Sequence, residues 1–159
     1  MTSPDGKYQF TLSDSGGQLH YSLTWNGKQT VKPSLLGINA NVEWRDGVEI
    51  GTVDSSRKDT IWHPVYGERS EIKDCYNAWK ILVNRQNGRD KLILDIRAYD
   101  EGIAFRYHFP GGQYLKITDE YTEYTMPEGT KAYFTPKAQT PYSYLPLEAG
   151  RASRTVRCC

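Results

Sequence analysis

The chain has few cysteines, and they form no recognisable pattern. Its 159 residues include three, Cys75, Cys158 and Cys159, of which the last two are adjacent at the C-terminus. An odd set with this spacing is typical neither of a disulfide framework nor of a zinc site. We therefore expect Cys75 to be a small, half-buried structural residue.

Two further absences narrow the class of protein. No apolar run approaches the roughly 18 to 20 residues of a membrane helix, and the N-terminal residues lack the basic and apolar parts of a signal peptide. We expect no membrane span, and a signal that was removed or that precedes this reading frame. Acids and bases nearly balance at a formal net charge of +1, so nucleic acid is not an expected partner.

Aromatic residues, by contrast, are abundant. Twelve Tyr and four Trp stand in a sequence poor in Ala and Leu, which favours strands. Turn signals recur at short intervals, and no amphipathic helix is evident. We predict an all-β fold of two packed antiparallel sheets, with turns at Asp5–Gly6, Asp14–Gly17, Asn26–Gly27, Asp46–Gly47, Asn87–Gly88, Asp100–Gly102 and Pro110–Gly112.

Alternation with a period of two identifies the strands. It places Tyr8, Phe10 and Leu12 on one face of a first strand. It places Leu19, Tyr21, Leu23 and Trp25 on one face of a second strand. Asn26–Gly27 is expected to close a hairpin, and the charged, Ser-rich stretch Asp54–Asp59 to be a loop. Further strands are predicted near Leu36–Trp44, Val48–Val53, Tyr76–Asn84, Leu92–Tyr99, Ile103–Phe109, Glu120–Tyr124 and Lys131–Phe134.

The hairpin at Asp100–Gly102 has two alternative registers. A type I turn with Gly102 in the left-handed region gives a three-residue loop, with Tyr99 opposite Ile103 and polar and apolar residues mixed on each face. A two-residue loop segregates the faces and puts Asp95 opposite Arg106. We predict the three-residue loop, because Glu101 is a poor residue for positive φ.

No catalytic or metal site can be assigned from spacing. Glycosidic cleavage needs two carboxyl groups at a fixed separation, but most acids here lie in or beside turns, where capping and solvation explain them. His20, His63 and His108 lack zinc spacing, and no calcium-loop signature occurs. We therefore predict no catalytic residue, no metal ligand and no cofactor in this chain.

Three residues are the candidates for a contact surface. Trp62 borders a proline and a polar loop, Tyr66 follows in that loop, and both could stack on a sugar ring or pack against a partner domain. Arg69 beside Glu68 fits either an ion pair or an interdomain contact. Trp79, inside an apolar strand, is expected to be packed in the core.

Several motifs, in their order and spacing, carry a family resemblance. They are Gly67–Arg69, Tyr76–Asn77 and the run Arg97–Tyr107, which reads Arg-Ala-Tyr-Asp-Glu-Gly-Ile-Ala-Phe-Arg-Tyr. Together they closely resemble the N-terminal domain of glycoside hydrolase family 97, enzymes of the α-glucosidase and α-galactosidase type. The similarity extends to about Leu147. Tyr66 and Ala78 depart from the pattern, where members often carry Trp and an acid.

The resemblance implies a fold, a partner and a place of action. It implies a β-supersandwich of the galactose-mutarotase-like kind that packs on a downstream (β/α)8 barrel. The barrel supplies the catalytic carboxylates and, in inverting members, most of the calcium ligands. The full-length enzymes are expected to be periplasmic or secreted. The resemblance therefore transfers no catalytic or metal residue to this chain, and leaves α-glucosides and α-galactosides open as substrates.

Three functions follow as alternatives. The first is a domain that packs on the barrel and shapes its site, inactive alone, with Trp62, Tyr66 and Arg69 at the interface. The second is a stand-alone carbohydrate-binding module that uses Trp62 and Tyr66. The third, an independent mutarotase-like enzyme, lacks a clear pair of His and Glu.

The C-terminus differs from the rest of the chain. Residues 3–150 are predicted to form the β-sandwich domain. Residues 151–159 alternate Arg with small residues and resemble nothing in the family. We expect this tail to be disordered, either as a frame-shifted end or as a basic extension.

Overall fold

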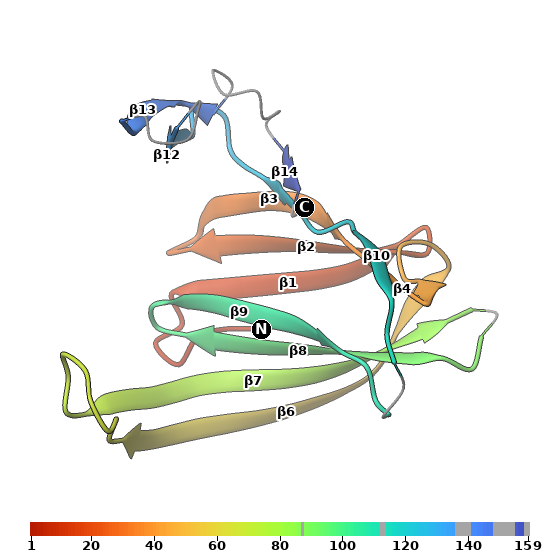
Figure 1. Cartoon of the computed structure of the whole chain (residues 1–159), viewed down its shortest axis with the longest axis horizontal. Helices are drawn as coiled ribbons and strands as arrows, with labels where there is room; N and C mark the ends of the chain where they lie inside the picture. The colour runs from red at the N-terminus through yellow and green to blue at the C-terminus, as the bar shows by residue number, and fades with distance from the viewer. Residues whose placement is uncertain (87, 112–113, 136–140, 148–154, 158–159) are drawn as a thin grey trace.

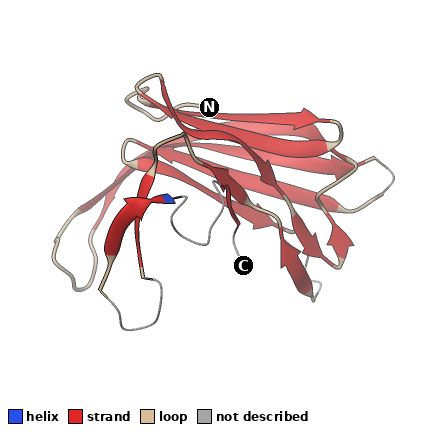
Figure 2. Ribbon diagram, turned by 90° about the horizontal axis from the view of Figure 1, so that it is seen from above, coloured by secondary structure: helices blue, strands red, loops and turns tan. Residues whose placement is uncertain are grey.

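The computed structural model describes residues 1–86, 88–111, 114–135, 141–147 and 155–157. Most of these residues lie in strands and none lies in an α-helix; a short helical turn at Leu147 is the blue segment in Figure 2. No helix in the described ranges is long and apolar enough to cross a membrane. The predicted all-β class is confirmed.

The N-terminal strands belong to a five-stranded sheet in the order β1-β2-β3-β11-β14 (Figure 1). Asn26 and Gly27 both have positive φ, 49° and 74°, and join β2 to β3 as the hairpin signal predicted. Phe10, Leu19 and Tyr21 point into the core, as the alternation predicted. The strands are β1 (Tyr8–Ser15), β2 (Gln18–Trp25), β3 (Lys28–Leu36), β11 (Glu123–Thr125) and β14 (Thr155–Arg157).

A four-stranded antiparallel sheet follows in the order β6-β7-β8-β9. It consists of β6 (Val48–Trp62), β7 (Ile72–Arg85), β8 (Lys91–Tyr99) and β9 (Gly102–His108). There are two smaller sheets, one of β10 (Ile117–Glu120), β4 (Ile38–Ala40) and β5 (Val42–Glu43), the other of β12 (Lys131–Phe134) and β13 (Ser143–Pro146).

The core lies between the two larger sheets. Phe10 stacks on Tyr21 at 5.4 Å within one sheet, and Tyr21 meets Phe105 of the other at 5.8 Å. Leu92, Leu94 and other alternate residues of the four-stranded sheet complete the cluster. Aromatic pairs of this geometry add to the free energy of apolar burial. The two-sheet sandwich is therefore as predicted.

Asp54–Asp59 is strand, so its prediction as a loop was wrong. β6 continues through it, with Ser56 opposite Ala78 and Lys58 opposite Tyr76. Every residue of β6 from Thr52 to Trp62 is exposed. An edge strand with two solvated faces needs only its hydrogen-bonded ladder, so polar side chains are no obstacle. Without an apolar face, the stretch showed no strand pattern.

The predicted β8–β9 register was also wrong. Asp95 lies opposite Arg106 and Tyr99 opposite Gly102, so the loop is the two residues Asp100 and Glu101. Among the described residues other than glycine, only Asn26 and Asn41 have positive φ, so this short loop does not require it at Glu101. Burying one apolar face of each strand outweighed the local turn preference.

Leu36–Trp44 is divided rather than a single strand. Asn41 has φ 63°, and Ala40 pairs with Val42 across it, which turns β4 back as β5. The predicted turn positions Asn87 and Gly112 lie outside the described residues, as do 151–154 and 158–159 of the expected tail. Thr155–Arg157 of that tail form β14 beside β11.

Candidate functional site

The predicted contact residues belong to the free end of the β6–β7 hairpin, at the lower left of Figure 1. Trp62 is the last residue of β6 and pairs with Ile72, the first of β7. Tyr66 and Arg69 lie in the loop between these strands. His63 stiffens the loop, since its Nδ1 lies 3.2 Å from the carbonyl oxygen of Ser70. One loop therefore carries all three predicted residues.

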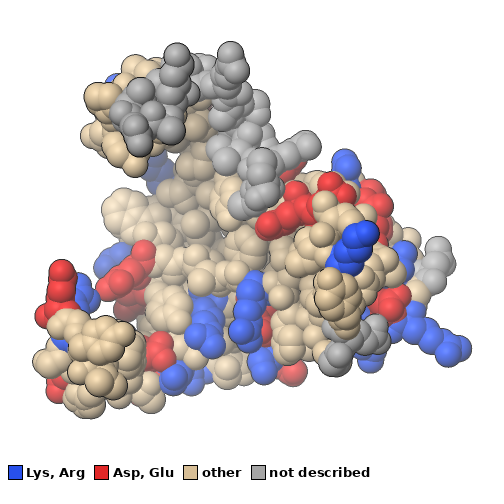
Figure 3. Space-filling view, in the orientation of Figure 1, with Lys and Arg blue, Asp and Glu red and all other residues tan. Residues whose placement is uncertain are grey.

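Apolar side chains at this end are strongly exposed. Val65 is 99% exposed, Tyr66 90%, Ile61 59% and Trp62 49%. We call these four residues the hairpin tip. Figure 3 shows mainly uncharged atoms at this end of the molecule, with charged atoms around them. Large apolar side chains exposed together at one end of a molecule are typical of a contact site. Ile61 and Val65 were missed from the sequence, where only the aromatic residues stood out.

Arg69 contributes to a different surface. It lines a recess of about 170 Å³ with Cys75, Tyr99 and Asp100, beside the β8–β9 turn. Among the described residues, no aromatic ring stacks on Trp62 or Tyr66. The structure therefore separates the arginine from the apolar hairpin tip.

A ladder of cations and aromatic rings covers the outer face behind the hairpin tip. Lys58 Nζ lies 2.7 Å from Asp74 Oδ2, and this hydrogen bond raises the pKa of the lysine. Arg97 stands over the ring of Tyr76, 4.6 Å from its centroid, and Tyr76 packs on Tyr99 at 5.0 Å. These contacts join β6, β7 and β8 on the solvent side. They stiffen the hairpin where no core supports it.

Asp95 is the most enclosed carboxylate of this outer face. Its side chain is 12% exposed, and its Oδ2 lies 2.8 Å from Arg106 Nε and 3.6 Å from His108 Nδ1. Its Oδ1 has no hydrogen-bond partner. The carboxylate is therefore paired with the Arg106 guanidinium on its own sheet. Nothing here resembles two carboxyl groups facing each other across a sugar.

A second apolar surface lies along β9. A groove of about 380 Å³ separates this edge strand from the inner face of β2 and β3, and Leu23, Val31 and Phe105 line it. Tyr107, at the end of the groove, is partly buried, and its hydroxyl lies 2.9 Å from Thr122 Oγ1. Burial raises the pKa of this phenol well above its usual range. The two large sheets thus leave part of their inner faces uncovered.

A metal site does not emerge from the described residues, because no three His, Cys, Asp or Glu side chains gather there. These residues therefore do not fit the calcium that the family resemblance implies for inverting enzymes. That this chain carries no cofactor stays a prediction.

Comparison with known proteins identifies the family of this domain. Residues 1–155 match the family described as Glycosyl-hydrolase 97 N-terminal. A curated relative, the retaining alpha-galactosidase of Bacteroides thetaiotaomicron, is 27% identical over 135 residues, which are 83% of this chain but 19% of that protein. The chain thus spans about a fifth of the length of this relative.

Solved structures share the fold. A glycoside hydrolase family 97 enzyme from Pseudoalteromonas sp. strain K8, in complex with acarbose, superposes with a TM-score of 0.84 at 23% identity, over 94% of this chain and 24% of that one. A beta-arabinopyranosidase superposes with a TM-score of 0.78 at 24% identity, over 87% and 23%. In both, the common fold occupies about a quarter of the solved chain.

Proposed function

The chain belongs to the N-terminal family of glycoside hydrolase 97, and from that premise we propose that it packs on the catalytic part of a larger glycosidase. In this role the domain shapes the mouth of an active site whose reacting groups lie in a downstream (β/α)8 barrel. The relatives support it, because their chains are four to five times as long as the part that this chain matches. The domain itself cleaves no glycosidic bond.

The observation that carries the proposal is the exposed hairpin tip. Its side chains contribute nothing to the sandwich core, and two of its four residues are at least 90% exposed. A surface of apolar residues rimmed by charge resembles the core and rim of a protein interface. Covering it with a second domain removes apolar surface from water, which stabilises the contact by about 25 cal/mol for each Å² buried.

The carboxylates support an inactive domain. A general acid in a glycosidase needs a raised pKa and a second carboxylate across the sugar. The pKa of Asp5 moves the other way, well below its usual range, because the side chains of Lys7 and Ser3 hydrogen-bond to it. Asp74 and Asp95 are bound to cations on their own sheet.

A carbohydrate-binding module is the second candidate, and the exposure of Trp62 and Tyr66 is what favours it. Aromatic faces complement the apolar faces of pyranose rings. The exposed apolar side chains of Val65 and Ile61 beside them, however, fit a protein partner better. Sugar binding at the hairpin tip is therefore the alternative that experiment must exclude.

The remaining properties concern the whole enzyme. An α-glucoside or an α-galactoside is the substrate that the family resemblance implies, and one relative is named an alpha-galactosidase. Calcium, where the enzyme uses it, binds the part outside this chain. We assign the enzyme to the periplasm or the secreted fraction, as the family resemblance implies.

The absence of catalysis is tested by assay. The purified chain should release no product from aryl α-glucosides or aryl α-galactosides, with or without calcium. Turnover that persists through purification and is abolished by Asp95→Asn, or by substituting another of its own carboxylates, would overturn the assignment.

The docking role is tested by self-association. With no partner domain, the hairpin tip should mediate weak, concentration-dependent association in sedimentation velocity. The double variant V65S/Y66S should sediment as a monomer at every concentration. The matched control, Tyr133→Ser, changes an exposed tyrosine on the separate β12–β13 hairpin. Equal association of all three proteins would contradict the role given to the hairpin tip.

A further inference from the structure

Two edges of the large sheets are protected against pairing with another strand. At β1 the N-terminal residues cover the edge, because Phe10 N donates to the carbonyl oxygen of Met1 at 2.8 Å and Ser3 N to that of Tyr8 at 3.0 Å. At β6 the edge is exposed and charged, above all along Asp54–Asp59. Charged side chains on an edge strand discourage the addition of a further strand.

The edge strand β9 has neither form of protection. Its inward side chains, Ile103, Phe105 and Tyr107, pack against the core but are only half-buried. Among the described residues, its backbone forms a ladder with β8 and with no other strand. An apolar edge strand without a cover is a template for a further strand.

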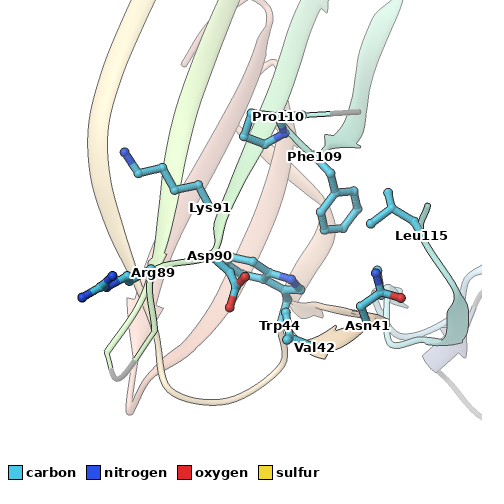
Figure 4. Close-up of a pocket in the computed structure, with 11 residues that line it drawn as sticks. Asn41, Val42, Trp44, Arg89, Asp90, Lys91, Phe109, Pro110 and Leu115 are labelled. Carbon is cyan, nitrogen blue, oxygen red and sulfur yellow. The ribbon is translucent and has the colours of Figure 1, made fainter. Parts of the chain in front are cut away.

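The chain that follows β9 turns away from this edge. Phe109 packs edge-on against Trp44 at 6.3 Å, beside a separate recess of about 370 Å³ that Leu115 also lines (Figure 4). β10 then pairs with β4. The chain meets β9 again at its end, where Thr122 contacts the hydroxyl of Tyr107. The described part of the chain therefore leaves the length of β9 open.

The register of β9 fixes the direction of its backbone groups. The loop from β8 has two residues, so Tyr99 and Gly102 form a hydrogen-bonded pair, and such pairs alternate along an antiparallel ladder. Even-numbered residues of β9 therefore bond to β8. The N–H and C=O groups of Ile103, Phe105 and Tyr107 point to the free edge instead, where a further strand can bond to them.

The groove beside β9 has the shape that such a strand requires. It measures about 380 Å³, and Leu23, Val31 and Tyr124 of the five-stranded sheet line the side that faces β9. Side chains alternate along a strand, so every second residue of an added strand would meet this apolar wall. The residues between them would lie beside Ala104 and Arg106, which are exposed on the outer face.

We propose that a strand from the part of the enzyme outside this chain pairs with β9 and fills the groove. The inference rests on the proposed function, because it needs a larger protein, and the matched part is about a quarter of the solved relatives. The added strand is apolar at alternate positions. Its main-chain bonds give this contact a different chemistry from the side-chain contact at the hairpin tip.

A second copy of the chain fits this edge less well. Its own β9 is already covered on the inner face, because Phe10 and Tyr21 lie 6.4 and 5.8 Å from Phe105 between ring centroids. Pairing two β9 strands would bring the five-stranded sheets of both copies to the same side of one continuous sheet. The β2 and β3 strands of one copy would then compete for space with the β1 and β2 strands of the other.

Amide hydrogen exchange gives a direct test, because the two sets of β9 amides should respond differently. The probe is the acetylated and amidated peptide Glu-Val-Thr-Val-Glu-Val-Thr-Val-Glu, added to the V65S/Y66S chain so that the hairpin tip does not associate. At about ten times its Kd, the peptide should slow exchange at Ile103, Phe105 and Tyr107 about tenfold. The amides along the free edge of β6 should not respond.

Matched controls separate strand addition from apolar binding. The same peptide with every valine N-methylated keeps its side chains but cannot donate to β9, so it should not bind. Leu23→Thr removes apolar surface from the groove and should weaken peptide binding about tenfold. Leu12→Thr should leave the affinity unchanged, because Leu12 is also partly buried against the core but lies outside the groove.

The source of the strand is tested by competition. Overlapping peptides that cover the alpha-galactosidase relative outside its matched residues should include at least one that displaces the probe. No protection by the probe, equal binding of the N-methylated peptide, or no competitor would overturn the proposal. So would protection of Ile103 and Phe105 that rises with protein concentration alone, because a second copy would then occupy the edge. None of these results bears on the hairpin tip, so the docking role is tested separately.

Discussion

The two halves of β6 and β7 have the same backbone pairing but opposite surroundings. At the inner end Val48, Ile81 and Val83 are buried at 2% exposure or less, whereas at the outer end Ile61 and Trp62 are about half exposed. The ladder runs through both, from Val48 opposite Arg85 to Trp62 opposite Ile72. The strands β6 and β7 therefore continue beyond the residues that the core buries. The outer end, residues 56–62 of β6 and 72–78 of β7, lies beyond the hydrophobic core cluster, and we call it the arm.

This difference in burial separates the residues that stabilise the fold from those that are exposed for contact with a partner. The inner half stabilises the sandwich through apolar burial. The arm depends on its hydrogen-bonded ladder and on the contacts of Lys58, Tyr76 and Arg97 on its outer face. Its apolar tip contributes nothing to the core, so substitutions there should change association rather than stability.

The largest effect is expected in the inner half. Leu94 is fully buried and lies between Ile81 and Tyr107 in the ladder. Leu94→Ala should lower the free energy of unfolding by about 2 to 5 kcal/mol, because it leaves a cavity in a packed core. Leu94→Ile, which conserves volume, should cost less than about 1.5 kcal/mol. Equal urea midpoints for both variants would contradict the packing described.

A buried polar contact should give the next effect. Tyr107→Phe removes a hydroxyl that binds Thr122 and accepts a backbone hydrogen bond from Gly37. We expect a loss of about 1 to 2 kcal/mol in urea unfolding at neutral pH.

The same variant has a pH signature. The pKa of Tyr107 is raised by burial, so in alkali the unfolded phenol ionises first, at about pH 10. The stability that Tyr107 contributes is full below that pH and declines as the pH rises toward the folded pKa. The difference between wild type and Tyr107→Phe should therefore shrink above about pH 10. A difference independent of pH would show that the phenol is not buried.

A smaller effect tests the β8–β9 register. Asp95 Oδ2 lies 2.8 Å from Arg106 Nε, and the arginine is 69% exposed. A double-mutant cycle with Asp95→Asn and Arg106→Gln should give a coupling of about 0.2 to 1 kcal/mol that falls in high salt. The register with Tyr99 opposite Ile103 would separate the two side chains. Coupling indistinguishable from zero at low salt would favour that register.

These two halves also explain what the sequence could predict. Where one face is buried, as in Leu92–Tyr99, the alternation of apolar residues revealed the strand and half of the core. Where both faces are exposed, as in Asp54–Asp59, no pattern existed to be found. The register of β8 and β9 was missed because a local rule about Glu101 was weighted above the burial of Phe105 and Ile103.

The candidate sites follow the same division. Trp62 and Tyr66 were predicted because aromatic residues in a polar loop stand out, but Val65 and Ile61 have no chemical signal until their exposure is known. Trp44 gave no signal at all. Its buried indole N–H lacks an acceptor, and Phe109, which packs against its ring, lies 65 positions later in the sequence.

The smallest effect on stability is expected in the arm. Ile61 lies opposite Lys73 in the ladder and is 59% exposed, so Ile61→Thr keeps a β-branched side chain and loses little buried area. The free energy of unfolding should change by no more than about 0.5 kcal/mol in urea denaturation. Ile81→Thr is the matched control, because Ile81 has the same side chain, lies on β7 and is 2% exposed. It buries an unpaired hydroxyl and should be much less stable. Equal destabilisation by both substitutions would show that the hairpin tip packs in the folded chain, and would remove the reason to assign it a partner.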